Sequence, residues 1–167
     1  MFTQEEQPLL TGSDAEIEAF VDADRCVIVD WRGMEIEAAE AVMPFLPDRA
    51  LSFEMAYPDA GGVEIRLGYL DRAEVFTLPF HPQNNFRVLL RVARLLEPGY
   101  EMALFRGTDG GDTQAFLLRP QEWWAAYRSS HPQQCERIFR PITDLVELWD
   151  LEKEAEPVAA RPWWKIW

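Results

Sequence analysis

Two pairs of acidic side chains at helical spacing form the strongest candidate site in the first part of the chain. Glu18 and Asp22 are four residues apart and Glu37 and Glu40 are three apart, so each pair lies on one helix face. Like charges at these spacings cost a few tenths of a kcal/mol per pair. A cationic partner would turn this repulsion into attraction, so we predict that all four residues bind a partner. A solvated polar face and a small enzyme with a carboxylate pair are the alternatives.

Other residue types with catalytic or metal-binding potential lack the spacing that such chemistry needs. His81 and His131 each precede a proline, so they would form a site only if two loops met. The sequence contains no Gly-x-Ser-x-Gly elbow, and the glycine-rich stretch 107–111 lacks the following helix and lysine of a phosphate loop. Asp109 and Asp112 suit a hairpin turn better than a calcium loop. We therefore predict no catalytic residue, no cofactor and no metal, hence no enzyme.

The cysteines and the basic residues also point away from common functions. Cys26 and Cys135 are too few for a disulfide framework and too isolated for a zinc site, so we expect reduced structural thiols. Arg87, Arg91 and Arg94 recur at helical spacing, but three arginines in so acidic a chain do not make a nucleic-acid footprint. We expect them to mark a solvated helix face.

The charge is distributed unevenly along the chain. The net charge is −13, from 29 acids and 16 bases. Residues 1–80 hold 17 acids and five arginines (−12), whereas residues 81–167 hold 12 acids and 11 bases (−1). Such a field repels nucleic acid and anionic membranes and attracts a basic partner. Solubility alone is the simpler explanation of a negative total, although it explains the imbalance less well.

The local patterns predict helices and strands that cluster rather than alternate. Ser13 and Glu16 form a capping box that opens the first predicted helix. Helices are also predicted over 34–43, 84–97, from Pro120 through an aromatic segment, over 133–139 and over 143–153. Strands are predicted over 25–31, 51–57, 63–69, 75–78, 100–106 and 113–118. The apolar run in the first of these strands predicts burial on both faces, and the short turns between the next three predict an antiparallel meander. The helix over 84–97 is predicted to bury one apolar stripe. The order favours an α+β fold with a mostly antiparallel sheet of about six strands flanked by helices.

We predict one domain over residues 1–167, because no internal repeat or low-complexity linker interrupts the chain. The tail, about 155–167, contains Trp163, Trp164 and Trp167, which we expect to dock on the domain or on a second copy in a homodimer. No apolar run approaches the roughly 18 residues of a membrane span. The N-terminus is acidic, unlike a secretory signal, so we expect a cytoplasmic protein.

The segment from Tyr100 to Trp124 carries a resemblance to a known group of proteins. Its Tyr-Glu at a strand start, Asp112-Thr113, Phe116-Leu117-Leu118, Pro120 and Trp123-Trp124 resemble small bacterial immunity-type proteins that accompany polymorphic or contact-dependent toxins. The resemblance implies a non-enzymatic protein that neutralises a toxin domain by covering its basic cleft with acidic side chains. An uncharacterised regulatory or self-associating α+β domain is the alternative.

Overall fold

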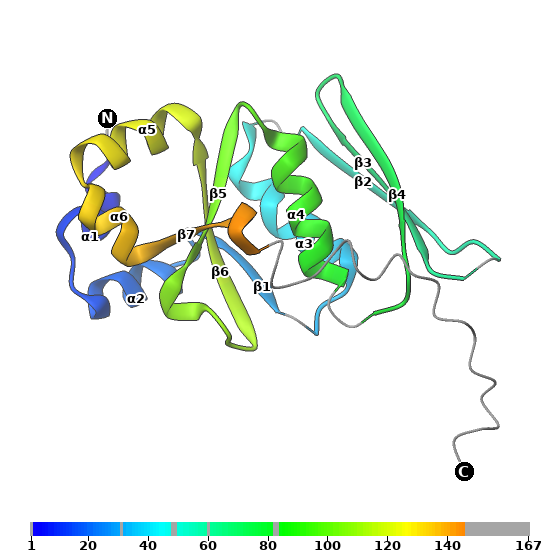
Figure 1. Cartoon of the computed structure of the whole chain (residues 1–167), viewed down its shortest axis with the longest axis horizontal. Coiled ribbons are helices and arrows are strands. Elements are labelled where there is room, and N and C mark those ends of the chain that lie inside the picture. Colours follow the sequence, from blue (N-terminus) through cyan, green and yellow to red (C-terminus); the bar gives the residue numbers. More distant parts are fainter. Residues whose placement is uncertain (1, 31, 48–49, 60, 82–83, 146–167) are drawn as a thin grey trace, which may run out of the picture.

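The helices and strands stack in four layers, in the order helices, sheet, helices, sheet (Figure 1). The computed structural model describes residues 2–30, 32–47, 50–59, 61–81 and 84–145. The predicted tryptophan-rich tail lies outside these residues. Side chains on the two faces of the first sheet belong to two separate hydrophobic cores. This sheet is therefore central, because helices pack against both of its faces.

The central sheet has four antiparallel strands in the order β1-β6-β5-β7. Its strands are β1 (Val27–Asp30), β5 (Tyr100–Phe105), β6 (Thr113–Pro120) and β7 (Phe139–Pro141). Alternate side chains of a strand point to opposite faces. Met102 and Leu104 accordingly enter one core, and Ala103 and Phe105 enter the other. The inner strands β5 and β6 are thus buried on both faces.

The edge strand β1 departs from its prediction. Its apolar run predicted burial on both faces, but Ile28 is 38% exposed whereas Val27 and Val29 are buried. β1 pairs only with β6, so it lies at the edge of the sheet.

The outer sheet is the predicted meander of β2 (Leu51–Ala56), β3 (Val63–Tyr69) and β4 (Arg72–Leu78). On its inner face Leu51, Ile65 and Leu67 belong to the core that it shares with the middle helices. Its opposite face carries mostly small or polar side chains, and no helix or strand of the described residues covers it. The side chains of that face are Ser52, Glu54, Ala56, Glu64, Arg66, Ala73, Val75 and Thr77.

The middle layer contains α3 (Glu35–Val42) and α4 (Asn84–Leu96), which lie between the two sheets. The predicted apolar stripe of α4 is buried, but so is Arg87, which is only 5% exposed. The prediction that Arg87 lies on a solvated face is therefore wrong. A helix with a sheet on each side has a much narrower solvent face than a helix packed on one sheet.

The outer helical layer packs around an aromatic core. Its helices are α1 (Gln7–Thr11), α2 (Asp14–Asp22), α5 (Gln121–Ser130) and α6 (Pro132–Ile138). Trp124 and Tyr127 of α5 have no exposed surface. The indole N–H of Trp124 donates a hydrogen bond of 2.9 Å to the carbonyl oxygen of Glu101, which ties this layer to the central sheet.

The α+β class and the antiparallel pairing are confirmed. The described residues form seven strands, and these strands are divided between two sheets rather than joined in one sheet of about six. Short 3-10 helices supplement the main elements, at Gln4–Glu6 (η1), Met43–Phe45 (η2), Arg106–Thr108 (η4) and Ile142–Leu145 (η5). None of the helices in the described part is long and apolar enough to cross a bilayer.

Candidate functional site

The first predicted acidic pair lies on α2, in the outer helical layer. Phe20 is the buried residue of this helix, so α2 packs through that side. Glu18 and Asp22 are exposed. Neither carboxylate makes an ion pair or hydrogen bond with another side chain in the described part of the chain. Both are therefore available to a partner.

The second predicted pair lies on α3, on the other face of the central sheet. α3 buries Ala38, Ala39 and Val42 and exposes both Glu37 and Glu40. The carboxylate of Glu37 accepts a hydrogen bond of 3.2 Å from the backbone N–H of Met34 and so caps its own helix. Glu40 has no such bond among the described residues. The structure thus assigns a structural role to Glu37 and leaves Glu40 available.

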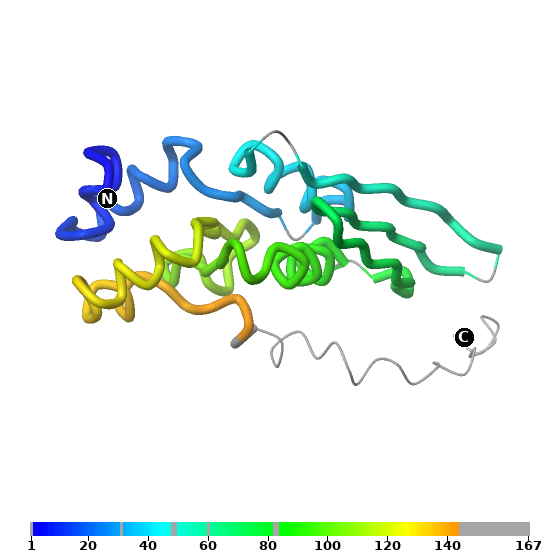
Figure 2. Tube along the Cα trace, turned by 90° about the horizontal axis from the view of Figure 1, so that it is seen from above, coloured from blue at the N-terminus to red at the C-terminus, as the bar shows by residue number. Residues whose placement is uncertain are grey.

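The two pairs do not form one cluster, because the central sheet separates α2 from α3. The two helices that carry them do lie on the same long side of the molecule. Figure 2 shows α2, β1, α3 and β2 following one another along this side, with α5, α6 and β7 toward the other. Residues 4–45 contain 11 acids and two arginines, a net charge of −9. Most of the net charge of the sequence thus belongs to the segments along this side, which we call the acidic side.

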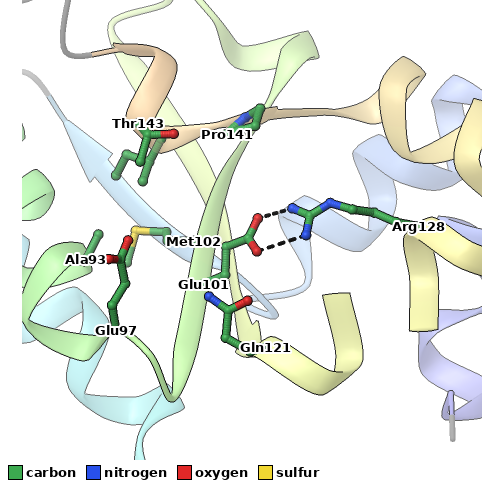
Figure 3. Close-up of a pocket in the computed structure, with 9 residues that line it drawn as sticks. Ala93, Glu97, Glu101, Met102, Gln121, Arg128, Pro141 and Thr143 are labelled. Atoms are coloured by element: carbon green, nitrogen blue, oxygen red, sulfur yellow. Dashed lines mark hydrogen bonds and ion pairs between the residues drawn. The ribbon is translucent and has the colours of Figure 1, made fainter. Parts of the chain in front are cut away.

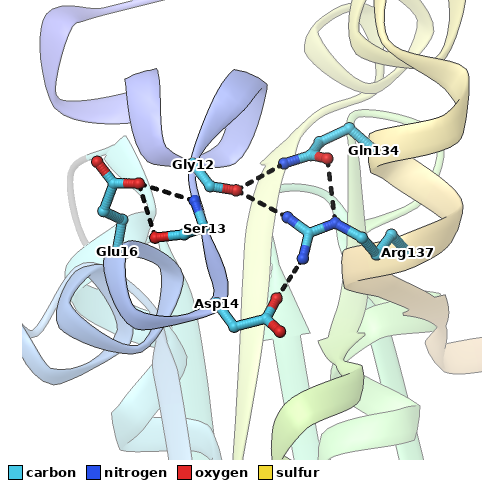
Figure 4. A network of polar contacts seen from close by, with 6 residues as sticks. All are labelled: Gly12, Ser13, Asp14, Glu16, Gln134 and Arg137. Carbon is cyan, nitrogen blue, oxygen red and sulfur yellow. Dashed lines mark hydrogen bonds and ion pairs between the residues drawn. The ribbon is translucent and has the colours of Figure 1, made fainter.

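Several acids of this side are used inside the protein. Arg137 of α6 donates to the carbonyl oxygen of Gly12 at 2.8 Å and pairs with Asp14, while Glu16 accepts the backbone N–H of Ser13 at 2.7 Å (Figure 4). The Ser13 N–H and hydroxyl lower the pKa of Glu16. This network joins the α1–α2 connection to α6, and it confirms the predicted capping box.

Glu6 is the most deeply buried of these acids, at 6% exposure. Its carboxylate accepts bonds of 2.9 Å from the Thr3 backbone N–H and from Nε of Arg119. Burial by itself would raise the pKa of Glu6, but the Thr3 N–H and the Arg119 guanidinium outweigh it, and the pKa is lowered. Glu6 is therefore a structural anion that holds η1 against β6.

Two adjoining pockets lie where β7 meets β5 and α5, and Arg128 and Pro141 line both. The first, of about 270 Å³, also contains Glu97, Glu101 and Gln121 (Figure 3). Nη1 and Nη2 of Arg128 each donate to one carboxylate oxygen of Glu101. The guanidinium carbon of Arg128 lies 5.3 Å from the ring centre of Trp124. This bidentate pair raises the pKa of Arg128. The charges of Glu101 and Arg128 thus neutralise each other.

The second pocket, of about 290 Å³, contains Cys135. Burial raises the pKa of this thiol, although the nearby Arg128 opposes the shift. Burial also raises the pKa of Cys26 to about 12. A thiol is nucleophilic only as the thiolate. Neither cysteine therefore has the activated state that covalent catalysis needs, and both are free thiols, as predicted.

The structure separates the remaining candidates of the sequence. His81 follows β4 of the outer sheet, whereas His131 lies between α5 and α6 in the outer helical layer. Asp109 pairs with Arg140 at 3.1 Å and Asp112 pairs with Arg32 at 3.2 Å. These aspartates therefore bind arginines from distant segments as well as occupying a turn. Within the described ranges no three His, Cys, Asp or Glu side chains cluster as a metal site would require.

No protein-family description, curated protein or solved structure matches this chain.

Proposed function

We propose that this chain is a non-enzymatic binding protein that neutralises a basic partner, a cognate bacterial toxin domain, in the cytoplasm. The observation that carries the proposal is the acidic long side, with its net charge of −9 over residues 4–45. Glu18, Asp22 and Glu40 are exposed there and bind no basic side chain of the described chain. Free carboxylates on one side of a protein attract a cationic surface and accelerate its approach.

The pocket chemistry supports binding rather than turnover. The thiol in the second pocket is held protonated, and the Glu101–Arg128 pair satisfies both of its charged groups. Neither arrangement supplies a base next to a nucleophile. The resemblance of Tyr100 to Trp124 to immunity-type proteins points in the same direction.

The experiment begins with the neighbouring genes. The product of each flanking gene is expressed alone and together with this chain, and growth of the host is measured. We expect one basic product to inhibit growth alone and not when this chain is present. Its association rate with the purified chain should fall as salt is raised, because screening weakens long-range attraction. A flanking toxic protein that this chain neither binds nor neutralises would contradict the proposal.

A self-associating domain is the second candidate, favoured by the edge strands of the β2–β3–β4 sheet. Both β2 and β4 are edge strands of this sheet, and edge strands can pair with another chain. Sedimentation at several protein concentrations separates the candidates. A dimer that persists at the lowest concentration, together with no binding to any basic protein, favours this second function.

A further inference from the structure

An exposed aromatic pair lies at one end of the outer sheet. Tyr57 follows β2 directly and Phe80 follows β4 by two residues. Both strands are antiparallel to β3, so β2 and β4 both end beside the first residues of β3. The two rings stack with centroids 6.3 Å apart and an angle of 20° between their planes. Tyr57 is nevertheless 62% exposed and Phe80 67% exposed.

Such exposure is unusual for residues of this size. An aromatic side chain buries roughly 150–250 Å² when it packs, and that burial is a large favourable term. Among the described residues, the hydroxyl of Tyr57 donates only to the sulfur of Met55, at 3.7 Å. Exposed aromatic side chains that gather in one place commonly anchor a binding partner.

The aromatic pair is connected to the first turn of α3. The side-chain amide of Asn84 donates to the carbonyl oxygen of Pro79 at 2.7 Å and to the carboxylate of Glu35 at 3.0 Å. Pro79, which precedes Phe80, is therefore linked through Asn84 to the start of α3. Met34, directly before α3, is 57% exposed. This connection links the apolar residues to the acidic side described above.

The charged residues in the segments that contain or adjoin the pair are acidic. The segments 34–37, 57–59 and 79–81 contain three acids, no lysine and no arginine. These acids are Glu35, Glu37 and Asp59. We name Met34, Glu35, Tyr57, Asp59 and Phe80 the aromatic–acidic edge. Acidic residues in the segments beside aromatic rings favour a cation, because ring faces are themselves electron-rich.

The geometry points to the aromatic–acidic edge as the anchor for the basic partner, with an arginine of that partner lying over the Tyr57 and Phe80 rings. This inference rests on the proposed function and names the contact that the function would use. The same sheet already contains such a contact, because the guanidinium of Arg91 lies 5.2 Å from the ring centre of Phe76. A second copy fits less well, since it would bring Glu35 and Asp59 against like charges.

An oligoarginine peptide tests the anchor on the full chain. Nuclear magnetic resonance spectra of the labelled protein are followed as the peptide is added, with an oligoglutamate peptide as the control. We expect the ring signals of Tyr57 and Phe80 to shift in a saturable manner with oligoarginine alone. Replacing both rings, by Tyr57→Ala with Phe80→Ala, should weaken binding about tenfold, which corresponds to about 1.4 kcal/mol.

Two further variants keep the result interpretable. Val75→Ala removes an apolar side chain that is 53% exposed on the other face of the same sheet, and it should leave the affinity unchanged. Tyr57→Phe keeps the ring and should bind like the wild type, which assigns the contact to the ring and not to the hydroxyl. Equal weakening by Val75→Ala and by the ring replacements would overturn the anchor.

The failure of this inference differs from failure of the proposed function. If oligoarginine shifts the α2 and α3 signals but leaves both rings unchanged, the anchor is wrong and the acidic side remains the cation-binding surface. If oligoarginine does not bind at all, the anchor is also wrong. The proposed function itself is tested separately, by whether this chain binds and neutralises a toxic flanking gene product.

Discussion

The Nη1 atom of Arg72 lies 2.6 Å from the carbonyl oxygen of Leu95. Arg72 begins β4 of the outer sheet, whereas Leu95 is in the last turn of α4. The same guanidinium donates to the carbonyl oxygens of Arg94, at 3.4 Å, and of Glu97. The last carbonyls of a helix have no partner within the helix and carry partial negative charge. Arg72 therefore caps α4 from the neighbouring layer.

Arg72→Ala should lower the free energy of unfolding by about 1–2 kcal/mol, because the α4 carbonyls lose a charged donor. Urea denaturation monitored by circular dichroism measures the change. The matched control is Arg66→Ala on β3, whose pair with Glu54 at 3.5 Å is solvent-exposed. This control should cost about 0–1 kcal/mol. Equal losses in both variants would show that the cap contributes nothing specific.

Glu6 should make stability depend on acid pH. Its pKa in the folded state is lowered from the ordinary value of 4.5, so the ionised form stabilises the fold above that value. This contribution is lost as the pH falls below 4.5 through the lowered pKa. Glu6→Gln should cost about 1–2 kcal/mol at neutral pH and progressively less in acid. Denaturation curves of both proteins across this range provide the test. Parallel pH profiles would contradict the assignment.

Tyr127 should stabilise the outer helical layer through its hydroxyl group. This group donates a hydrogen bond to the backbone carbonyl of Leu9, and both residues are fully buried. Tyr127→Phe should cost about 1–2 kcal/mol, because the carbonyl of α1 loses this donor where no water replaces it. Tyr57→Phe is the control, since that ring is 62% exposed and its stability change should be near zero. If denaturation gives the same loss for both, the buried hydrogen bond is not the cause.

Glu37 and Glu40 of α3 should both contribute to binding, and Glu37 should also contribute to stability. Glu40→Lys should change the free energy of unfolding by less than about 0.5 kcal/mol, as is usual for exposed residues without contacts. Glu37→Lys should cost about 0.5–1 kcal/mol, because Met34 loses its acceptor and a cation enters a helix N-terminus. Both variants should slow association with a basic partner at low salt, as stopped-flow measurements would show. Unchanged association rates would remove these residues from the binding surface.

The C-terminal tail remains a prediction of the sequence. Deleting residues 162–167 removes Trp163, Trp164 and Trp167 together. If they dock on the domain, the melting temperature should fall by several degrees, and if they join two copies, a dimer should become a monomer. Calorimetry and light scattering measure the two outcomes. No change in either would leave the tail as a separate binding element.

Local patterns determined the elements wherever neighbours in the chain suffice. The Ser13–Glu16 box opens α2, since a helix cap joins residues only three positions apart. The alternation over 51–78 produced the predicted meander, because short turns force antiparallel pairing. The acidic candidates were also found locally, because charge and helical spacing are readable in one segment. The aromatic–acidic edge was missed, because Tyr57 and Phe80 meet only through the pairing of both strands with β3.

Only the tertiary structure decided which surfaces face water. The stripe of α4 predicted one buried side, yet Arg87 is buried because a second sheet covers the helix. The run around Ile28 predicted burial on both faces, yet β1 lies at an edge and exposes Ile28. The sequence assigned Glu37 and Glu40 one role, and the fold separated them through the N–H of Met34. Burial depends on contacts between segments far apart in the chain, and periodicity within one segment reports nothing about its distant neighbours.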